Sequence, residues 1–358
     1  MRTVTGRYLA GRVLHAAITV WAAFTLSFTM LHLLPGDPVV IMLGGADAAA
    51  DATPAQIAAL RSEYGLDKPL AAQYLSRLDA AAHGDFGTSL QTGDTVVHTV
   101  TAAMPQTLAL AGAGLALACV LGLGVAVAAV MTRSRWLARI LGAVPPVGVC
   151  LPQFVVGLAL LQVVSFQWHL LPAFGAPLGV GLILPAVTLA LPTASVLAQV
   201  FARSLTETLD QPYITTARAK GAGRVRILLR HAARNAAVPL LSLAGLVAGN
   251  LLAGSVVVET VFSRNGFGRI TAAAVEAKDI PVVQGAVVLG AVVFSVVGLV
   301  VDLLNPLLDP RFARRGSGFG SSSGSGSSSG SGSSSSSGSG SGSGSGRSGR
   351  RWLGARAA

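Results

Sequence analysis

Long uncharged apolar stretches dominate the chain and alternate with shorter polar segments. No Asp, Glu, Lys or Arg lies between Asp94 and Arg133, or between Arg139 and Arg203. A helix crosses a bilayer with about 20 apolar residues, and helices satisfy their own backbone groups in lipid. The pattern predicts an all-α integral membrane protein with six transmembrane helices, at residues 13–34, 103–131, 140–165, 181–202, 237–258 and 282–304.

Composition agrees with a membrane protein, since only 11% of the 358 residues are charged, whereas soluble domains carry about 25%. The first apolar stretch is too long for a signal-peptide core, and Pro35-Gly36 follows it instead of a cleavage site. We therefore expect it to be retained as the first helix. Cys119 and Cys150 both fall in predicted spans without metal-ligand spacing. We expect no disulfide, metal or cofactor.

The positions of Lys and Arg predict the orientation in the membrane. A cytosolic N-terminus places three basic groups on one side, at residues 2–12, 133–139 and 203–234. Six spans then leave both termini in the cytosol. The net charge of +11 follows from this topology, so we do not expect nucleic acid to be a partner.

These signals divide the chain into four regions. Residues 1–34 hold the N-terminal tail and the first helix, and residues 35–100 form a small external subdomain. Residues 101–312 form a core of five helices with a cytosolic loop at 204–238. Residues 313–358 form a Gly/Ser-rich tail that cannot bury apolar surface; the arginines at its end either meet anionic headgroups or stay solvated.

The external subdomain shows short helical patterns. Residues 54–60 and 70–82 are predicted to form amphipathic helices, and Ala71, Tyr74, Leu75 and Leu78 share a face of the second. The sequence from Gly84 to Gly87 predicts a turn.

The cytosolic loop is predicted to hold two helices, at residues 205–219 and 224–237, joined by a turn at residues 220–223. On the second helix, Arg226, Arg230 and Arg234 share one face and fit an interface with anionic headgroups. Val225, Leu229 and Ala232 or Ala233 are predicted to form its apolar side. On the first helix, Tyr213, Ala217 and Gly221 stand four apart, which leaves a shallow face that fits a groove on another protein.

One motif in this loop carries a family resemblance. The segment Tyr213–Gly221 has the form Tyr-x-x-Thr-Ala-x-Ala-Lys-Gly, with Thr215 where the wider superfamily has Glu. Further short motifs occur in order at Pro35–Pro38, Gly65–Pro69, Gly84–Ser89, Glu259–Phe262, Gly266–Arg269, Asp279–Pro281 and Asp309–Arg311. From about residue 8 to 312, the chain resembles inner-membrane permease subunits of dipeptide, oligopeptide and nickel ABC importers.

The resemblance implies a type I ABC importer permease fold in a bacterial cytoplasmic membrane. It implies partners: a homologous second permease subunit, two cytosolic ATP-binding subunits, an extracytoplasmic substrate-binding protein and membrane lipid. It implies that an ATP-binding subunit docks on the helix around residues 209–220. The residues of this coupling site are Asp210, Tyr213, Thr216, Ala217, Ala219, Lys220 and Gly221.

The resemblance also makes four charged residues candidates for contact with the binding protein: Glu259, Arg264, Arg269 and Asp279. The alternative for these four is a role in salt bridges and caps within the loops.

The chain carries no phosphate-binding loop, since none of Lys68, Lys220 and Lys278 follows the required glycine pattern. It also lacks a series of ionisable residues within the spans, which proton-driven carriers use. We therefore predict a transporter subunit that is not itself an enzyme and is driven by separate ATPase subunits. The expected cargo is di- or oligopeptides. The alternatives are a nickel or nickel-chelate importer of the same family, a stand-alone channel or secondary carrier, and a membrane scaffold or receptor.

Overall fold

The structure is a computed structural model that describes residues 2–33, 39–40, 53–63, 67–174 and 179–308. Within these ranges the chain is almost entirely helical, and the only β-pairing is an isolated bridge between Thr88 and Thr95. The predicted tail at 313–358 and most of the stretch from 34 to 52 lie outside the described residues.

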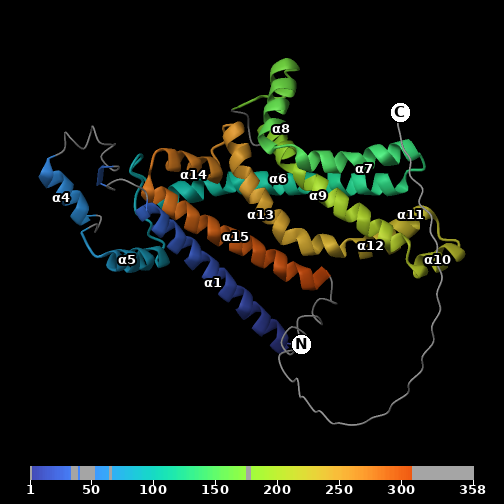
Figure 1. The fold of residues 1–358 in the computed structure, drawn as a ribbon, viewed down its shortest axis with the longest axis horizontal. Helices are drawn as coiled ribbons and strands as arrows, with labels where there is room; N and C mark the ends of the chain where they lie inside the picture. The colour runs from blue at the N-terminus through green and yellow to red at the C-terminus, as the bar shows by residue number, and fades with distance from the viewer. Residues whose placement is uncertain (1, 34–38, 41–52, 64–66, 175–178, 309–358) are drawn as a thin grey trace, which may run out of the picture. The chain divides into compact units, whose positions relative to one another are not determined.

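Within the described residues, five long helices are apolar enough to cross a membrane. They are α1 (Arg2–Leu33), α6 (Val96–Met131), α9 (Ile183–Leu209), α13 (Val238–Val261) and α15 (Ile280–Leu308) (Figure 1). They correspond to five of the six predicted spans. The all-α membrane fold predicted from the sequence is therefore confirmed.

The third predicted span, at 140–165, is not one continuous helix. It is formed by α7 (Arg135–Cys150) and α8 (Gln153–Leu160), which continues as the π-helical segment η1 (Leu161–Gln167), and the two halves meet at an angle of 104°. Leu151, between them, is extended, the conformation that the ring of Pro152 favours at the preceding residue. Residues 140–165 are one span only if this bent pair is counted as one.

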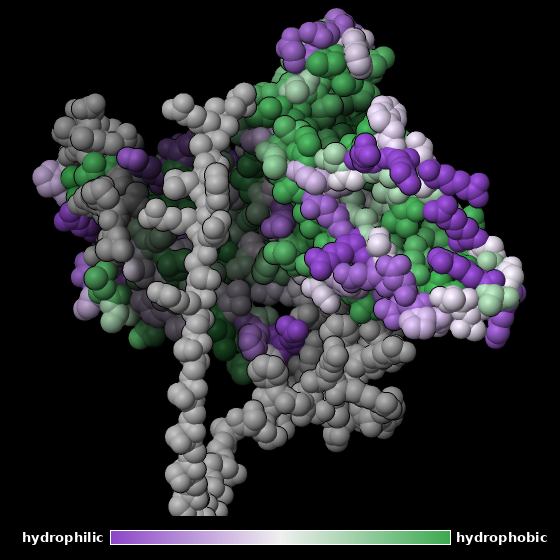
Figure 2. All heavy atoms as spheres, turned by 45° about the vertical axis from the view of Figure 1, so that its right-hand side comes forward, coloured by the Kyte–Doolittle hydropathy of each residue, from purple (hydrophilic) through white to green (hydrophobic). Residues whose placement is uncertain are grey.

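Apolar side chains cover much of the visible surface (Figure 2). Examples are Trp21, Met30 and Val120, with 53%, 60% and 70% of their surface exposed. Soluble monomers rarely expose contiguous apolar patches of this kind. The surface therefore fits contact with lipid and with other membrane subunits.

The most extensive pairing among the described helices joins α6 to α9. The face of α6 toward the interior repeats small residues at intervals of four, including Gly114, Ala118, Gly122 and Ala126. A Cβ on Gly122 would lie 2.6 Å from the carbonyl oxygen of Ala194. Small residues at this spacing let two membrane helices approach closely.

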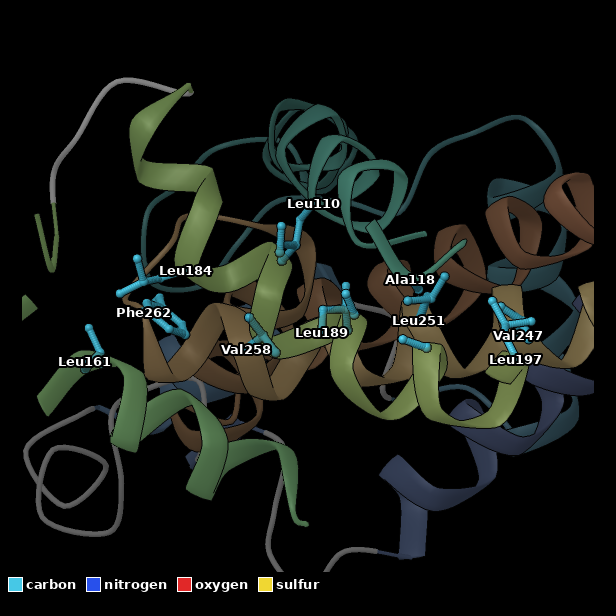
Figure 3. Close-up of a cluster of buried hydrophobic side chains, with 13 residues drawn as sticks. Leu110, Ala118, Leu161, Leu184, Leu189, Leu197, Val247, Leu251, Val258 and Phe262 are labelled. Atoms are coloured by element: carbon cyan, nitrogen blue, oxygen red, sulfur yellow. The ribbon is translucent and has the colours of Figure 1, made fainter. Parts of the chain in front are cut away.

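The central core gathers side chains from α6, η1, α9 and α13 (Figure 3). Leu110 and Leu189 are completely buried, and Leu251 and Val258 pack against them from α13. The helix α9 also contacts α7, α8 and α12, so it is the central element of the bundle.

Before α6, the chain forms α4 (Pro54–Glu63) and α5 (Leu70–Ala82), in agreement with the two short helices predicted there. Tyr74 packs edge-on against Phe24 and Phe28 of α1 and bonds the hydroxyl of Thr25 at 2.9 Å. Leu75, expected on the same face, is instead 63% exposed.

The bundle has two ends. The helices α9 and α13 contact each other, and the Arg264 guanidinium, just after α13, donates to Gly181 O, just before α9. The pair is therefore antiparallel. The segment after α13, α14 (Phe267–Glu276), marks one end, here called the α14 end. The segment after α9, α10 (Pro212–Ala219), marks the opposite end, here called the α10 end (Figure 1).

Candidate functional site

At the α10 end, the predicted helix at 205–219 is split in two. The helix α9 continues to Leu209, Asp210 caps it, and α10 begins at Pro212. Gln211 is extended with ψ 145° because it precedes a proline, and proline favours the first position of a helix. The expectation of one helix overlooked Pro212. The result is a short helix that is separate from the long one.

The turn after α10 is a Schellman motif. Gly221 N donates to Arg218 O at 2.9 Å, and Ala222 N donates to Ala217 O at 3.1 Å. Gly221 has φ +80°, a left-handed conformation that costs other residues about 1–2 kcal/mol. The predicted turn at 220–223 is therefore present, and glycine is needed at its second position.

The helix α10 is held to the bundle by a small number of contacts. Ile214 is completely buried, and the amide of Asn235 donates to the hydroxyl of Tyr213 at 2.9 Å. Of the other predicted coupling residues, Ala217 is half-buried, and the rest are exposed: Asp210, Thr216, Ala219, Lys220 and Gly221. The structure therefore brings these residues together on one short element with an accessible outer surface.

The return segment consists of α11 (Arg224–Arg226), the π-helical segment η3 (Ile227–Ala232) and α12 (Ala233–Ala236). Its buried face is formed by Ile227, Leu228, Ala232 and Ala236. The predicted apolar side was right for Ala232 but wrong for Val225 and Leu229, which are 56% and 64% exposed. The face at Leu228 and Ala232 is buried because it packs on Phe201 and Leu205 of α9.

Arginines surround this segment. Arg226, Arg230 and Arg234 are exposed, as the predicted stripe requires. Arg224 has a different role, because its guanidinium donates to Val130 O at 3.1 Å. That carbonyl belongs to the last turn of α6, where carbonyls lack helical partners and favour a cation. Arg224 thus joins the return segment to α6.

At the α14 end, Glu259 is buried, with 1% of its surface exposed. Its carboxyl group accepts three hydrogen bonds, from Thr107 Oγ1 at 2.6 Å and from the backbone amides of Gly268 at 2.8 Å and Arg269 at 3.2 Å. Glu259 was expected to contact a docking protein. Because it is enclosed by α6 and α14, the prediction needs correction, and the alternative of a cap within the loop fits the structure.

Asp279 needs the same correction, since only 2% of its surface is exposed. Its carboxyl group accepts from Ser89 Oγ at 2.6 Å and from the amide of Val282 in the first turn of α15 at 3.4 Å. Asp279 therefore caps α15 and joins it to the segment that precedes α6.

The two arginines are partly exposed. Arg269 donates to Ser263 O at 2.6 Å and to Asn265 Oδ1 at 3.2 Å, which closes the loop before α14. Arg264 donates to Gly181 O at 3.0 Å. Of the four predicted contact residues, only these two retain surface for a partner.

Sequence reasoning missed Thr107 and assigned no role to Ser89, although Ser89 ends one of the motifs. Each hydroxyl bonds a carboxyl group far away in the chain, 152 residues from Thr107 and 190 from Ser89. Thr107 is one of three threonines in α6, and the sequence shows neither which of them is buried nor its partner. Among the described residues, no group of three or more His, Cys, Asp or Glu is placed to hold a metal ion.

A bundle of long apolar helices, with a short accessible helix at one end, is the architecture of an integral membrane protein. The chain belongs to the family of binding-protein-dependent transport system inner membrane components. The profile of that family matches residues 118–314, and the profile of its N-terminal region matches residues 5–111.

Curated relatives cover nearly the whole chain. The glutathione transport system permease protein GsiC of Escherichia coli strain K12 is 34% identical over 303 residues, which is 85% of this chain and 97% of that protein. The GsiC protein of Salmonella typhi is 35% identical over 304 residues, with the same coverage. Among solved structures, a chain of the MetNI methionine ABC transporter in an inward-facing conformation is similar, with a TM-score of 0.43 and 18% identity. That match covers 60% of this chain and 95% of the other.

The chain is therefore the permease subunit of a binding-protein-dependent ABC importer, a multi-pass protein of the inner membrane. Members of this family are membrane components that lack an ATPase site of their own, and they work with ATP-binding subunits, a substrate-binding protein and a second permease.

Proposed function

We propose that this permease carries short peptides inward and that α10 is the element through which an ATP-binding subunit drives it. The observation that carries the proposal is the geometry of α10, a short helix with an accessible outer surface that is fixed to the bundle. Its exposed residues suit a groove on a partner.

The anchoring of α10 supports a mechanical role. Buried Ile214 and the bond between Tyr213 and Asn235 connect it to the return segment. Arg224 then connects that segment to the end of α6. A displacement of α10 is transmitted through these contacts to the long helices, and the bundle changes between two arrangements that open to opposite sides.

The proposed substrate rests on the relatives. Two GsiC proteins, at 34% and 35% identity, are named as glutathione transport permeases, and glutathione is a short peptide. Nickel or a nickel chelate remains the alternative within the family. The test compares cells with and without this chain for uptake of labelled di- and tripeptides and of radioactive nickel. Only the uptake of the true cargo is expected to be lost when the chain is absent.

We also propose the topology. The α10 end and both termini face the cytosol, and the α14 end faces outward, where Arg264 and Arg269 are available to a binding protein. Cysteines placed at Lys220 and at Lys278, with native Cys119 and Cys150 replaced by Ala, test the topology. In intact cells an impermeant maleimide is expected to label position 278 and spare position 220. Labelling of position 220 contradicts the proposal.

The same proposal divides the chain into four regions: a tail with the first helix, an external subdomain at 35–100, a core at 101–312 and a C-terminal tail. The proposal also names the particular partners, which are two ATP-binding subunits and a homologous second permease.

The docking role is tested by a charge reversal on α10 with a matched control. Lys220→Glu is expected to reduce both co-purification of the ATP-binding subunits and peptide uptake, with the amount of inserted permease unchanged. Arg226→Glu makes the same change on the exposed side of α11, outside α10, and is expected to affect both much less. Equal loss for the two variants, or loss of insertion with Lys220→Glu, contradicts the docking site. Flux through the chain reconstituted alone, without ATP, favours a channel or carrier instead.

A further inference from the structure

The start of α14 lacks a cap from its own segment. Its N-cap residue is Gly266, which has no side chain to accept a bond from the first free amides. Those amides, of Gly268 and Arg269, donate to Oε2 of Glu259 instead. Glu259 belongs to α13. The cap of α14 is therefore supplied by the preceding helix.

A third helix shares this cap. Thr107 of α6 donates its hydroxyl hydrogen to Oε1 of Glu259 at 2.6 Å, and its oxygen accepts from Phe267 N at 2.9 Å. The one hydroxyl thus bonds both the capping group and the helix that it caps. Only 2% of Thr107 and 1% of Glu259 is exposed. Breaking these hydrogen bonds costs free energy, because the polar groups that lose their partners would remain buried.

Two glycines make the close approach possible. A Cβ on Gly266 would collide with the carboxyl group of Glu259. A Cβ on Gly268 would collide with Val256 of α13, whose Cγ2 would lie 2.8 Å away. The residues of the Glu259 and Gly266–Gly268 motifs therefore form one structural unit, in which glycine provides the space that the carboxyl group and α13 occupy.

The far end of α14 is fixed in a similar way. The helix ends in a Schellman turn, with Lys278 left-handed at φ +55° and Asp279 N bonded to Ala274 O at 2.8 Å. Asp279 then accepts the bond from Ser89, which lies in the segment that leads into α6 at Val96.

Apolar packing completes the connection between these segments. Val96 and Val100 of α6, Ala274 of α14, and Val282 and Ala286 of α15 form one buried cluster, with Phe267 against it. Both ends of α14 are thus bonded to α6 or to the segment that leads into it, and the length between them packs on the same helix.

We propose that α14, the α13 turns around Glu259 and the first turns of α6 form one rigid joint, in which Thr107 and Glu259 are positioning residues. During transport α14 then moves with α6, and the opening at this end depends on the position of α6. The inference rests on the proposed function only in assuming two access states. It concerns how the α14 end moves, whereas the coupling proposal concerns the α10 end.

The first test measures the joint in the complete transporter, reconstituted in lipid with its ATP-binding, second permease and binding-protein subunits. Spin labels are placed at exposed Ala102 of α6 and Ala273 of α14, with Cys119 and Cys150 replaced by Ala. The distance distribution between the labels is expected to be narrow and the same in the nucleotide-free and ATP-trapped states. Distances that differ between the two states overturn the rigid joint.

The second test removes the shared hydroxyl. Thr107→Val keeps the shape of the side chain and removes both bonds, and is expected to broaden the label distances. Peptide imported per ATP hydrolysed is expected to fall about tenfold, the scale of one lost hydrogen bond to a charged group. Thr107→Ser, which keeps the hydroxyl, is expected to restore both measurements.

Thr101→Val is the matched control. This threonine is exposed on the same helix, and its hydroxyl bonds only carbonyls of its own helix, those of Val97 and His98. Thr101→Val is expected to leave the label distances and the peptide imported per ATP hydrolysed as they are in the unsubstituted protein. If Thr107→Val also leaves distances and coupling unchanged, Thr107 is not a positioning residue. If Thr107→Val fails to insert, the comparison of the two states in the unsubstituted transporter decides the proposal alone.

The failure of this inference is separable from the failure of the proposed function. If the coupling site is wrong, the Lys220→Glu permease still binds the ATP-binding subunits and imports peptide normally, whatever the label distances show. If the rigid joint is wrong, the distances between the spin labels change with nucleotide while uptake still depends on Lys220.

Discussion

The side-chain amide of Asn235 donates to the hydroxyl of Tyr213 at 2.9 Å, across 22 residues of the chain. Tyr213 stands in the first turn of α10, and Asn235 stands in α12, just before the chain enters α13. The bond therefore joins the separate short helix to the segment that continues into a membrane span. Tyr213 belongs to the motif at 213–221 that the sequence pointed to, but its contact with Asn235 is visible only in the fold.

Removing this bond is expected to weaken coupling. Tyr213→Phe deletes the hydroxyl and keeps the ring, and the loss of one partly exposed hydrogen bond costs about 0.5–1.5 kcal/mol. We expect peptide uptake to fall a few-fold while the amount of permease in the membrane stays constant. Tyr74→Phe is the control, because it removes a comparable bond, to Thr25, far from α10. Equal effects of the two substitutions on uptake contradict a special role for Tyr213.

The turn after α10 is expected to depend on one glycine and not on its neighbour. Gly221→Ala places a Cβ at φ +80°, which costs about 1–2 kcal/mol, although nothing lies within 4 Å of the added atom. Gly221→Asn is expected to cost less, since Asn tolerates this conformation. Gly223→Ala is the control, with φ −66° and equally open space.

Uptake and co-purification of the ATP-binding subunits are the measurements for this turn. The expected order of impairment is Gly221→Ala, then Gly221→Asn, then Gly223→Ala, with the last close to the unsubstituted protein. Impairment by Gly223→Ala as strong as by Gly221→Ala excludes backbone strain as the cause.

The contact between α6 and α9 predicts a second pair of contrasting glycines. A Cβ on Gly122 would lie 2.6 Å from Ala194 O and 3.0 Å from Leu197 Cβ, and relief requires a shift of backbone. Gly122→Ala is therefore expected to destabilise the bundle by about 1–3 kcal/mol. Gly124→Ala, on the same helix, meets nothing within 4 Å and is expected to be tolerated. Thermal unfolding of the purified transporter in detergent compares the two, and equal midpoints contradict the close packing.

The sequence was sufficient for the membrane class, the family and five spans, because long uncharged stretches and ordered motifs are properties of the sequence itself. It was not sufficient where one proline decides the local geometry. Pro152 divides the third span and Pro212 separates α10 from α9, yet proline also occurs inside continuous helices here, at Pro105 and Pro192.

Burial was the other property that the sequence did not show. Charged residues in predicted loops were expected at the surface, and Glu259 and Asp279 are instead enclosed. Their partners, Thr107 and Ser89, come from segments far away in the chain. Such pairings depend on how helices meet in three dimensions, so a single sequence contains no direct sign of them.

The bond between Ser89 and Asp279 provides the last prediction, which concerns stability at the α14 end. The two side chains are 6% and 2% exposed and 2.6 Å apart, and a hydrogen bond to a carboxylate contributes about 1.5–3 kcal/mol. Single substitutions also disturb other bonds, because Ser89 Oγ accepts from the amide of Gln91 and Asp279 caps Val282. A double-mutant cycle with Ser89→Ala and Asp279→Asn separates the shared part. We expect the double variant to be less destabilised than the sum of the single variants, measured by thermal unfolding of the transporter, and strict additivity would mean that the two groups do not stabilise each other.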